Sequence, residues 1–319
     1  MLPESPAMRW GLQPITYGLT WQESLAAVRA VDSLGFDYLW GHDHLWSTGA
    51  DPLQPFFEGW TALTAWAALT ERVRLGLLVG ANPFRNPGLV AKMAATVDHV
   101  SGGRLVLGLG AGNREAETRA HGLDPGASVG ERLDWLDGAL TIIRGLLAGE
   151  TVTHHGERYH FDGVAHAPRP LQARVPIVIG ASGERKGLRL VARHADIWHQ
   201  WLGHDQVDVY RHKSEVLDGH LDEAGRARAE IERHVGGRVV IRDTTAQARQ
   251  FFDEQVRLHG WGPDMTSFAF IGTPEQVAAW VVRYRDAGAG GFSGSVAAPL
   301  DLETIERLAG EVRPLVDGA

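Results

Sequence analysis

Cysteine is absent from all 319 residues of the sequence, which excludes disulfide bonds and thiolate catalysis. Long apolar runs are absent too: no window reaches the length of a membrane span, and the first ten residues lack the basic and apolar segments of a signal peptide. We therefore expect a cytoplasmic protein. Basic residues are in the minority, and the net charge of −8 gives no support for binding nucleic acid or a membrane surface.

What the sequence does contain is a regular alternation of short apolar runs and amphipathic segments. Apolar residues make up 44 % of the chain, which is enough to bury a large core. Runs that are apolar throughout predict strands covered on both faces, and apolar residues three and four apart predict helices. In the first part of the chain the expected strands are 8–15, 36–43, 73–81 and 104–112, and the expected helices are 20–35, 58–70 and 87–101.

Capping residues mark where several helices begin. Thr20 and Glu23 stand at capping-box spacing, as do Thr273 and Gln276, and Asn86 precedes a proline at the first helical position. Side chains of these types accept hydrogen bonds from the free amides of a first helical turn. The three helices are therefore expected to begin at these residues.

The alternation continues to the C-terminus with one interruption. A helix at 130–149 and a short hairpin at 151–163 fall between the fourth and fifth strands, and we interpret them as an insertion at about 125–175. Strand–helix pairs then resume. We predict one α/β domain over 1–319, a (β/α)8 TIM barrel with an insertion after strand 4. A doubly wound open sheet is the alternative, because periodicity does not show whether a sheet closes.

In a barrel of this kind the functional groups come from the carboxyl ends of the strands. The second predicted strand ends in Gly41-His42-Asp43-His44. Because an imidazole exchanges protons near neutral pH, His44 is a candidate catalytic residue, and Asp43 is a candidate for orienting it or for binding a ligand. His42 is expected to point the other way and to have a structural role.

Two glycine-rich turns follow the fourth and fifth strands. One is GLGAGNRE, with Gly108, Gly110 and Gly112, and the other is IGASGERK, with Gly180 and Gly183. Such turns leave backbone amides free to bind an anion. Neither has the complete glycine spacing of a dinucleotide fingerprint, so neither by itself predicts a dinucleotide site.

Five segments of the chain form a recognisable series. They are GFDYLWGHDHL, RNPGLVAKMAATVDHVSGGRLVLGLGAGNREAE, GERLDWLDGALTIIRGL, PIVIGASGERKGLRLVARHADIW and GTPEQVAAW, in that order and over nearly the whole chain. Together they resemble the luciferase-like monooxygenase superfamily, and most closely its branch that uses the deazaflavin coenzyme F420. The resemblance implies a (β/α)8 barrel with an insertion after the fourth strand, hydride transfer between F420 and an organic substrate, and a homodimer.

The resemblance also implies roles for particular residues. It places Asp43 and His44 beside the deazaflavin ring, and a non-prolyl cis peptide between Leu78 and Val79 behind that ring. The backbone on the phosphate side of the cofactor corresponds to two turns, which comprise Ala111, Gly112 and Asn113, and Gly180, Ala181, Ser182 and Gly183.

Two positions depart from the sugar-phosphate dehydrogenases of the F420 branch. Some of those enzymes carry a Trp four residues after the His, where this chain has Thr48, and a glutamate where this chain has Asn113. The resemblance therefore does not imply a sugar-phosphate substrate. We expect a small-molecule substrate that the sequence does not identify.

Two other functions remain open, and the sequence disfavours a third. The same fold could bind reduced FMN and act as a monooxygenase, since turns that hold a phosphate serve either cofactor. A barrel without catalysis would keep only a flavin site. A metal-dependent hydrolase needs a cluster of carboxylates and histidines at strand ends, where Asp43, His44 and His199 are too few. The histidines of the predicted hairpin fit a solvated tip, so no metal site is predicted.

Overall fold

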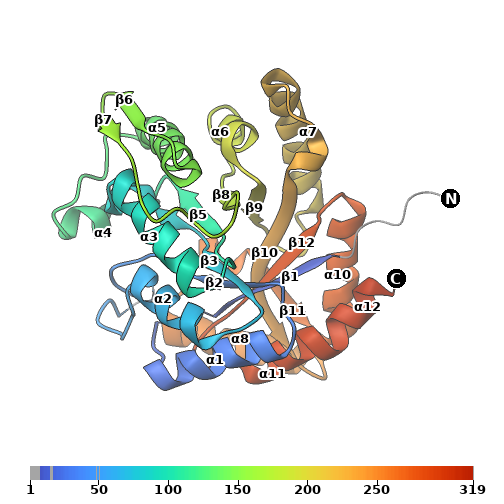
Figure 1. Ribbon diagram of the computed structural model, residues 1–319. Coiled ribbons are helices and arrows are strands. Elements are labelled where there is room, and N and C mark those ends of the chain that lie inside the picture. The colour runs from blue at the N-terminus through green and yellow to red at the C-terminus, as the bar shows by residue number, and fades with distance from the viewer. Residues whose placement is uncertain (1–7, 15–16, 48, 50, 319) are drawn as a thin grey trace.

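The computed structural model describes residues 8–14, 17–47, 49 and 51–318. Ile15, the last residue of the first predicted strand, and Thr48 lie outside this range. Parallel strands form the centre of the molecule and helices cover them (Figure 1). The barrel strands are β1 (Arg9–Pro14), β2 (Tyr38–Gly41), β3 (Arg74–Leu77) with β4 (Gly80–Ala81), β5 (Leu107–Gly110), β8 (Ile177–Gly180), β9 (Ile197–Trp201), β10 (Glu232–Ile241) and β12 (Gly291–Val296).

The order of the strands shows that the sheet closes on itself. From β3 it runs through β2, β1, β12, β10, β9, β8 and β5 to β4, and a short strand β11 (Ala269–Gly272) extends the pairing of β10. Only Leu78 and Val79 separate β3 from β4, and a parallel bridge joins Leu75 to Leu105. The predicted (β/α)8 barrel is confirmed, and the open-sheet alternative is wrong.

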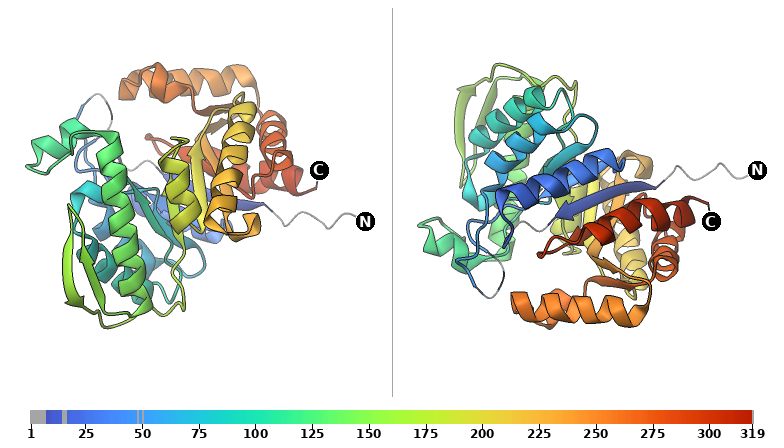
Figure 2. Two further views of the ribbon diagram at one scale, coloured as in Figure 1. Left: turned by 90° about the horizontal axis from the view of Figure 1, so that it is seen from above. Right: turned by 90° about the horizontal axis from the view of Figure 1, so that it is seen from below.

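Helices surround the barrel on its outside (Figure 2). The longer ones are α1 (Trp21–Ser33), α2 (Gly59–Leu69), α3 (Pro87–Val100), α5 (Val129–Ala148), α6 (Gly187–His194), α7 (Val207–Ala224), α8 (Thr245–His259) and α10 (Pro274–Asp286). Capping boxes form at Thr20 and at Thr273, and Asn86 caps α3, as the sequence predicts. No helix in the described part of the chain is both long and apolar enough to cross a membrane. The cytoplasmic location stays a prediction.

The segment between β5 and β8 is only partly an addition to the barrel. The predicted hairpin is present as a separate two-stranded sheet of β6 (Val152–His155) and β7 (His160–Val164). The long helix α5, in contrast, packs against both α3 and α6 and so takes the place of an ordinary barrel helix. The interpretation of that helix as inserted is wrong, because it provides the parallel crossover from β5 to β8.

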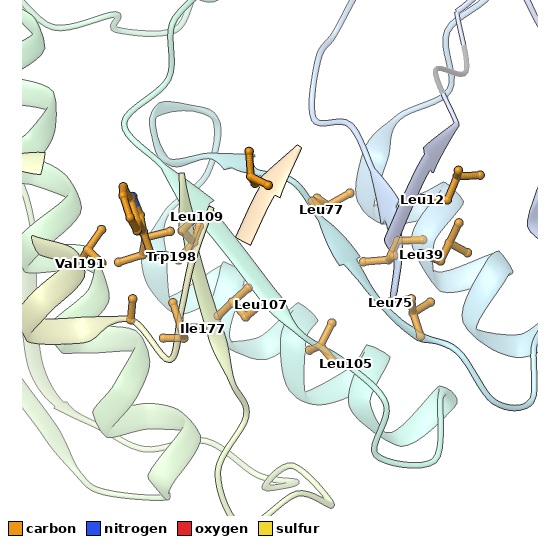
Figure 3. Close-up of a cluster of buried hydrophobic side chains, with 14 of the residues drawn as sticks. Leu12, Leu39, Leu75, Leu77, Leu105, Leu107, Leu109, Ile177, Val191 and Trp198 are labelled. Carbon is orange, nitrogen blue, oxygen red and sulfur yellow. The ribbon is translucent and has the colours of Figure 1, made fainter. Parts of the chain in front are cut away.

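Apolar side chains fill the space on both sides of the sheet. Outside it, Leu39, Leu75 and Leu107 belong to the cluster that includes apolar helix residues (Figure 3). Inside it, Trp40 and Val106 belong to a second cluster. Burial on both faces explains why the strands read as continuous apolar runs.

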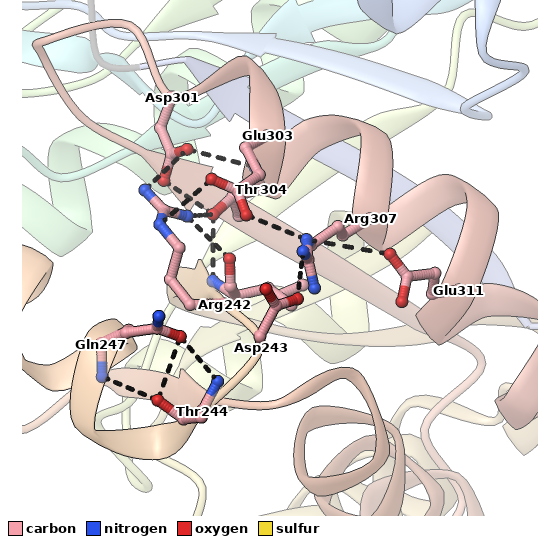
Figure 4. Close-up of polar contacts among 10 residues, drawn as sticks. Arg242, Asp243, Thr244, Gln247, Asp301, Glu303, Thr304, Arg307 and Glu311 are labelled. Carbon is pink, nitrogen blue, oxygen red and sulfur yellow. Dashed lines mark hydrogen bonds and ion pairs between the residues drawn. The ribbon is translucent and has the colours of Figure 1, made fainter.

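A polar network fixes the far end of β10. Arg242 contacts Asp301 at 3.1 Å and Glu303 at 3.3 Å, and the amide of Ile241 donates to the Thr304 hydroxyl at 3.0 Å (Figure 4). The three partners belong to the start of α11 (Leu302–Arg307) and to its cap, Asp301. The last strand–helix unit is thereby joined to the mouth of the barrel.

Candidate active site

The chain leaves β2 with side chains that alternate between the inside and the outside of the barrel. Trp40 points inward, where its indole N–H donates to a serine hydroxyl of β12 at 3.1 Å. His42 and His44 continue on the inner side, and both rings lie near Phe56, with centroids 6.5 and 6.4 Å away. His42 therefore points opposite to its neighbour Asp43, as alternation along a strand predicts, and shares the side of His44.

Asp43 is 3 % exposed, and β4 and the segment after it bind its carboxylate. Arg85 donates to both of its oxygens, at 2.7 and 2.9 Å, and the amide of Ala81 donates to Oδ2 at 2.8 Å. Among the described residues no hydrogen bond joins Asp43 to His44. The predicted role of Asp43 in orienting His44 is therefore wrong, because its carboxylate instead ties the end of β2 to the neighbouring strand. Its contact with a cofactor stays a prediction.

The carboxylate that does bind His44 is Glu117, a residue that the sequence reasoning missed. Glu117 lies on α4 (Glu115–Ala120), is completely buried, and has Oε2 at 2.8 Å from His44 Nδ1. Its Oε1 accepts hydrogen bonds from the amides of Leu45 and Trp46. Burial opposes ionisation, but these hydrogen bonds outweigh it and lower the pKa of Glu117 below its ordinary value.

His42 differs from His44 in its surroundings. Burial, together with the nearby charges of His44 and Arg238, lowers the pKa of His42 to about 3. His42 is therefore neutral over the physiological range and cannot act as a cation there. Its Nδ1 is buried and has no hydrogen-bond partner among the described residues.

The bulge between β3 and β4 has the geometry that the resemblance implies. The peptide between Leu78 and Val79 is cis, which confirms that prediction. Gln13 donates through Nε2 to the carbonyl of Leu78 at 2.9 Å. Val79 projects toward β5 and β8: a Cβ at Gly110 would lie 2.7 Å from its side chain, and one at Gly180 would lie 3.4 Å away. Glycine at both positions leaves room for Val79.

Three carbonyl groups of the turn after β8 accept hydrogen bonds from three different elements, β9, α7 and α6. The Ala181 carbonyl accepts from Trp198 at 2.9 Å, the Ser182 carbonyl from Lys213 at 2.5 Å, and the Gly183 carbonyl from the first turn of α6 at 2.9 Å. In a trans peptide the following N–H points opposite to the carbonyl. The amides of residues 182–184 therefore face away from these partners, and a contact between this turn and a phosphate stays a prediction.

The turn after β5 has one residue whose conformation requires glycine. Gly112 has φ +79° and lies against Pro83, whereas Gly108 and Gly110 belong to β5 itself. Ala111 is half-buried and Asn113 is exposed. The helix that follows, α4, has only six residues. A contact between this turn and a phosphate stays a prediction.

These features fit a flat polar cofactor with a phosphate arm. Gln13 is 1 % exposed, and Nε2 faces two carbonyl oxygens, those of Leu78 and Gly41. Since carbonyls only accept, the orientation of the amide is determined, and Oε1 must point elsewhere. Oε1 has no partner among the described residues, so it is available to a ligand N–H or O–H.

A group of aromatic residues that the sequence reasoning missed lies near His42 and His44, since the Tyr17 ring and both histidine rings lie next to Phe56. The Arg238 guanidinium lies 3.5 Å from the ring centroid of Trp261, whose N–H donates to the Tyr17 hydroxyl at 2.8 Å. The ring of His259 stacks on Trp261 at 4.8 Å. Two other tryptophans, Trp10 and Trp198, are fully buried in the core. Only the tertiary structure brings Tyr17 to Trp261.

A closed barrel with an imidazole and glycine turns at its carboxyl end has the layout of a barrel enzyme. The family model for luciferase-like monooxygenases matches residues 8–290. The chain belongs to the luciferase-like monooxygenase family.

The chain is also similar in sequence to individual curated proteins of this family. The chain is 38 % identical over 211 residues to the F420-dependent glucose-6-phosphate dehydrogenase of Microbacterium testaceum, covering 63 % of this chain and 59 % of that protein. The matches span about half the length of the curated relatives.

Solved structures share the fold over nearly the whole chain. An F420-dependent secondary alcohol dehydrogenase in complex with an F420–acetone adduct has a TM-score of 0.81 at 20 % identity and covers 97 % of this chain and 99 % of its own. A riboflavin lyase with modified FMN and riboflavin also has a TM-score of 0.81, at 16 % identity, covering 98 % of this chain and 92 % of its own. Both F420 and FMN thus occur on this fold.

Proposed function

We propose that the chain is an oxidoreductase that binds coenzyme F420 and transfers a hydride between it and a small organic substrate. The observation that carries the proposal is the imidazole of His44, held at the mouth of the barrel by a buried carboxylate. An imidazole in this place can exchange the substrate's proton as hydride moves. The F420-dependent relative and the F420-bound structural neighbour support the choice of coenzyme.

The protein contributes binding, orientation and proton exchange, while a bound deazaflavin supplies the hydride chemistry. Leu78 and Val79 would support the ring from behind, and the turns at 111–113 and 180–183 would hold the phosphate side. Asp43 would stabilise this arrangement through its bonds to the segment after β4. His44 is the catalytic residue and gives or takes the substrate's proton.

The proposal does not extend to glucose 6-phosphate, although one relative uses it. The resemblance to sugar-phosphate dehydrogenases fails at the position of Asn113, where a glutamate is expected, and Asn113 is exposed. The other departure, at Thr48, lies outside the described residues. Small neutral molecules such as secondary alcohols are the first substrates to test.

A fluorescence titration of the apoprotein with F420, and separately with FMN, tests the choice of cofactor. We expect saturable binding of F420 at micromolar concentration or below, and clearly weaker binding of FMN. Preferred binding of FMN, with oxygen uptake when reduced FMN is supplied, would replace the proposal with a monooxygenase. Binding of neither cofactor would contradict it and favour a barrel without catalysis.

The proposed enzyme is a homodimer, as the resemblance implies. In its support, a groove of about 580 Å³ lies between α2 and α3, and its lining includes Trp60, Ala65, Ala68, Met93, Val97 and Val100. We expect light scattering to give twice the chain mass of 34.8 kDa, and Ala65→Glu to give monomers. Ala224→Glu, on an exposed helix end, is the control and should stay dimeric. A monomeric wild-type protein would contradict this assembly.

A further inference from the structure

Glu117 joins two parts of the site that are distant in the sequence. His44, Leu45 and Trp46 follow β2, whereas Glu117 is on α4, more than seventy residues later. One carboxylate oxygen faces the imidazole and the other accepts from two backbone amides. The Glu117 carboxylate is fully buried, which is unfavourable for a charged group unless hydrogen bonds compensate it. The hydrogen bonds that do so all come from the segment 44–46.

The chemistry of these contacts determines which nitrogen of the His44 imidazole carries the hydrogen. An ionised carboxylate only accepts hydrogen bonds, so the atom that it meets at 2.8 Å, His44 Nδ1, must carry a hydrogen. The neutral ring then has its lone pair on Nε2. Glu117 is ionised at neutral pH because its hydrogen bonds keep its pKa low. His42, which lies on the same side of the strand, is neutral and places no charge against this arrangement.

We infer that Glu117 is a positioning residue that fixes the tautomer of His44, so that Nε2 is the atom that takes and returns the substrate's proton. The inference rests on the proposed function, in which His44 exchanges that proton. It adds the atom that acts and the residue that selects it. It also assigns a function to α4, a six-residue helix whose one completely buried carboxylate faces the site.

Glu117→Gln is the variant that tests the inference. The amide oxygen of the glutamine will keep the position that accepts from Leu45 and Trp46, since those amides can only donate. Its NH2 group must then face His44 Nδ1, and a donor facing Nδ1 requires that nitrogen to accept. The substitution is therefore expected to invert the tautomer and to leave the hydrogen on Nε2.

The readout is ¹⁵N NMR of histidine-labelled apoprotein above pH 8, with the His44 signals assigned from a His44→Ala sample. We expect a protonated Nδ1 in the wild-type protein and a protonated Nε2 in Glu117→Gln. The control is Glu115→Gln, on the same helix, whose glutamate is half-exposed and pairs with Arg132; it should keep the wild-type tautomer. A wild-type His44 protonated on Nε2 would overturn the inference even if the variant failed to fold.

Kinetics separate this inference from the proposed function. With F420 bound, Glu117→Gln is expected to lower kcat by about 100-fold, with little change in KM, because a ring with the wrong tautomer cannot act as the base. An inverted tautomer with unchanged kcat would contradict the role of His44 in proton exchange, while Glu117 would still select the tautomer. An unchanged tautomer would contradict the role of Glu117.

Discussion

Replacing His44 with alanine is expected to lower turnover by about 100- to 10,000-fold, the usual contribution of a general acid–base group. The imidazole is at the mouth of the barrel and is only partly buried, with Glu117 behind it. Removing it takes away the proton acceptor, while every residue of the turns after β5 and β8 is kept. We therefore expect the affinity for F420 to stay close to that of the wild-type protein, measured by fluorescence titration alongside kcat.

The matched control is His194→Ala. This histidine contacts Asp137 at 2.6 Å, so it resembles His44 in having a carboxylate partner, but it is the last residue of α6 and so lies at the end of that helix away from the mouth. Its turnover should be that of the wild-type protein. Full activity in His44→Ala would show that another group exchanges the proton, and the proposed role of His44 would then fail.

Gly108→Ala is expected to destabilise the fold by more than about 4 kcal/mol, a size reached only by severe packing faults. A Cβ at this position would overlap the carbonyl oxygen of Leu77 and would lie 3.3 Å from Val178. The obstacle on the β3 side is backbone, which cannot move aside as a flexible side chain does. Urea unfolding followed by circular dichroism measures the loss, provided that the variant accumulates as folded protein.

Gly219→Ala is the control for the stability measurement. Gly219 is exposed within α7, and a Cβ there would contact nothing within 4 Å. Alanine in a helix interior is favoured over glycine by roughly 0.5–1 kcal/mol, so this variant should be as stable as the wild-type protein or slightly more so. If Gly108→Ala lowered the free energy of unfolding by less than about 1 kcal/mol, β3 and β5 would have to be able to move apart without unfolding. That result would contradict the packing argument.

The features that the sequence predicted well depend on near neighbours in the chain. The capping boxes at Thr20 and Thr273 span only four residues, and the strand pattern needs only a run of apolar side chains. The number and order of strand–helix units then pointed to a barrel, although closure itself required the pairing of β4 with β5. The cis peptide at Leu78 was expected from the resemblance and not from any local pattern.

Apart from the direction of Asp43, which local alternation decides, the features that the sequence reasoning missed or misassigned depend on distant neighbours. Asp43 and His44 are adjacent in sequence, which suggested that one orients the other, but alternation sends their side chains to opposite sides of the strand. Gly108 was taken for a turn glycine and proved to be a strand residue that lets two backbones approach. Glu117 resembles the other glutamates of its segment until the fold buries it.

The sequence alone therefore determined the class of this protein: the alternating elements, the helix boundaries, the glycine turns and a histidine at the end of a strand. These follow from side-chain volume, polarity and short-range hydrogen bonding, which a linear pattern records. Only the tertiary structure decided which carboxylate meets His44, and it is Glu117 and not Asp43. The physical reason is that burial and direction, which select among chemically identical side chains, exist only after the barrel has closed.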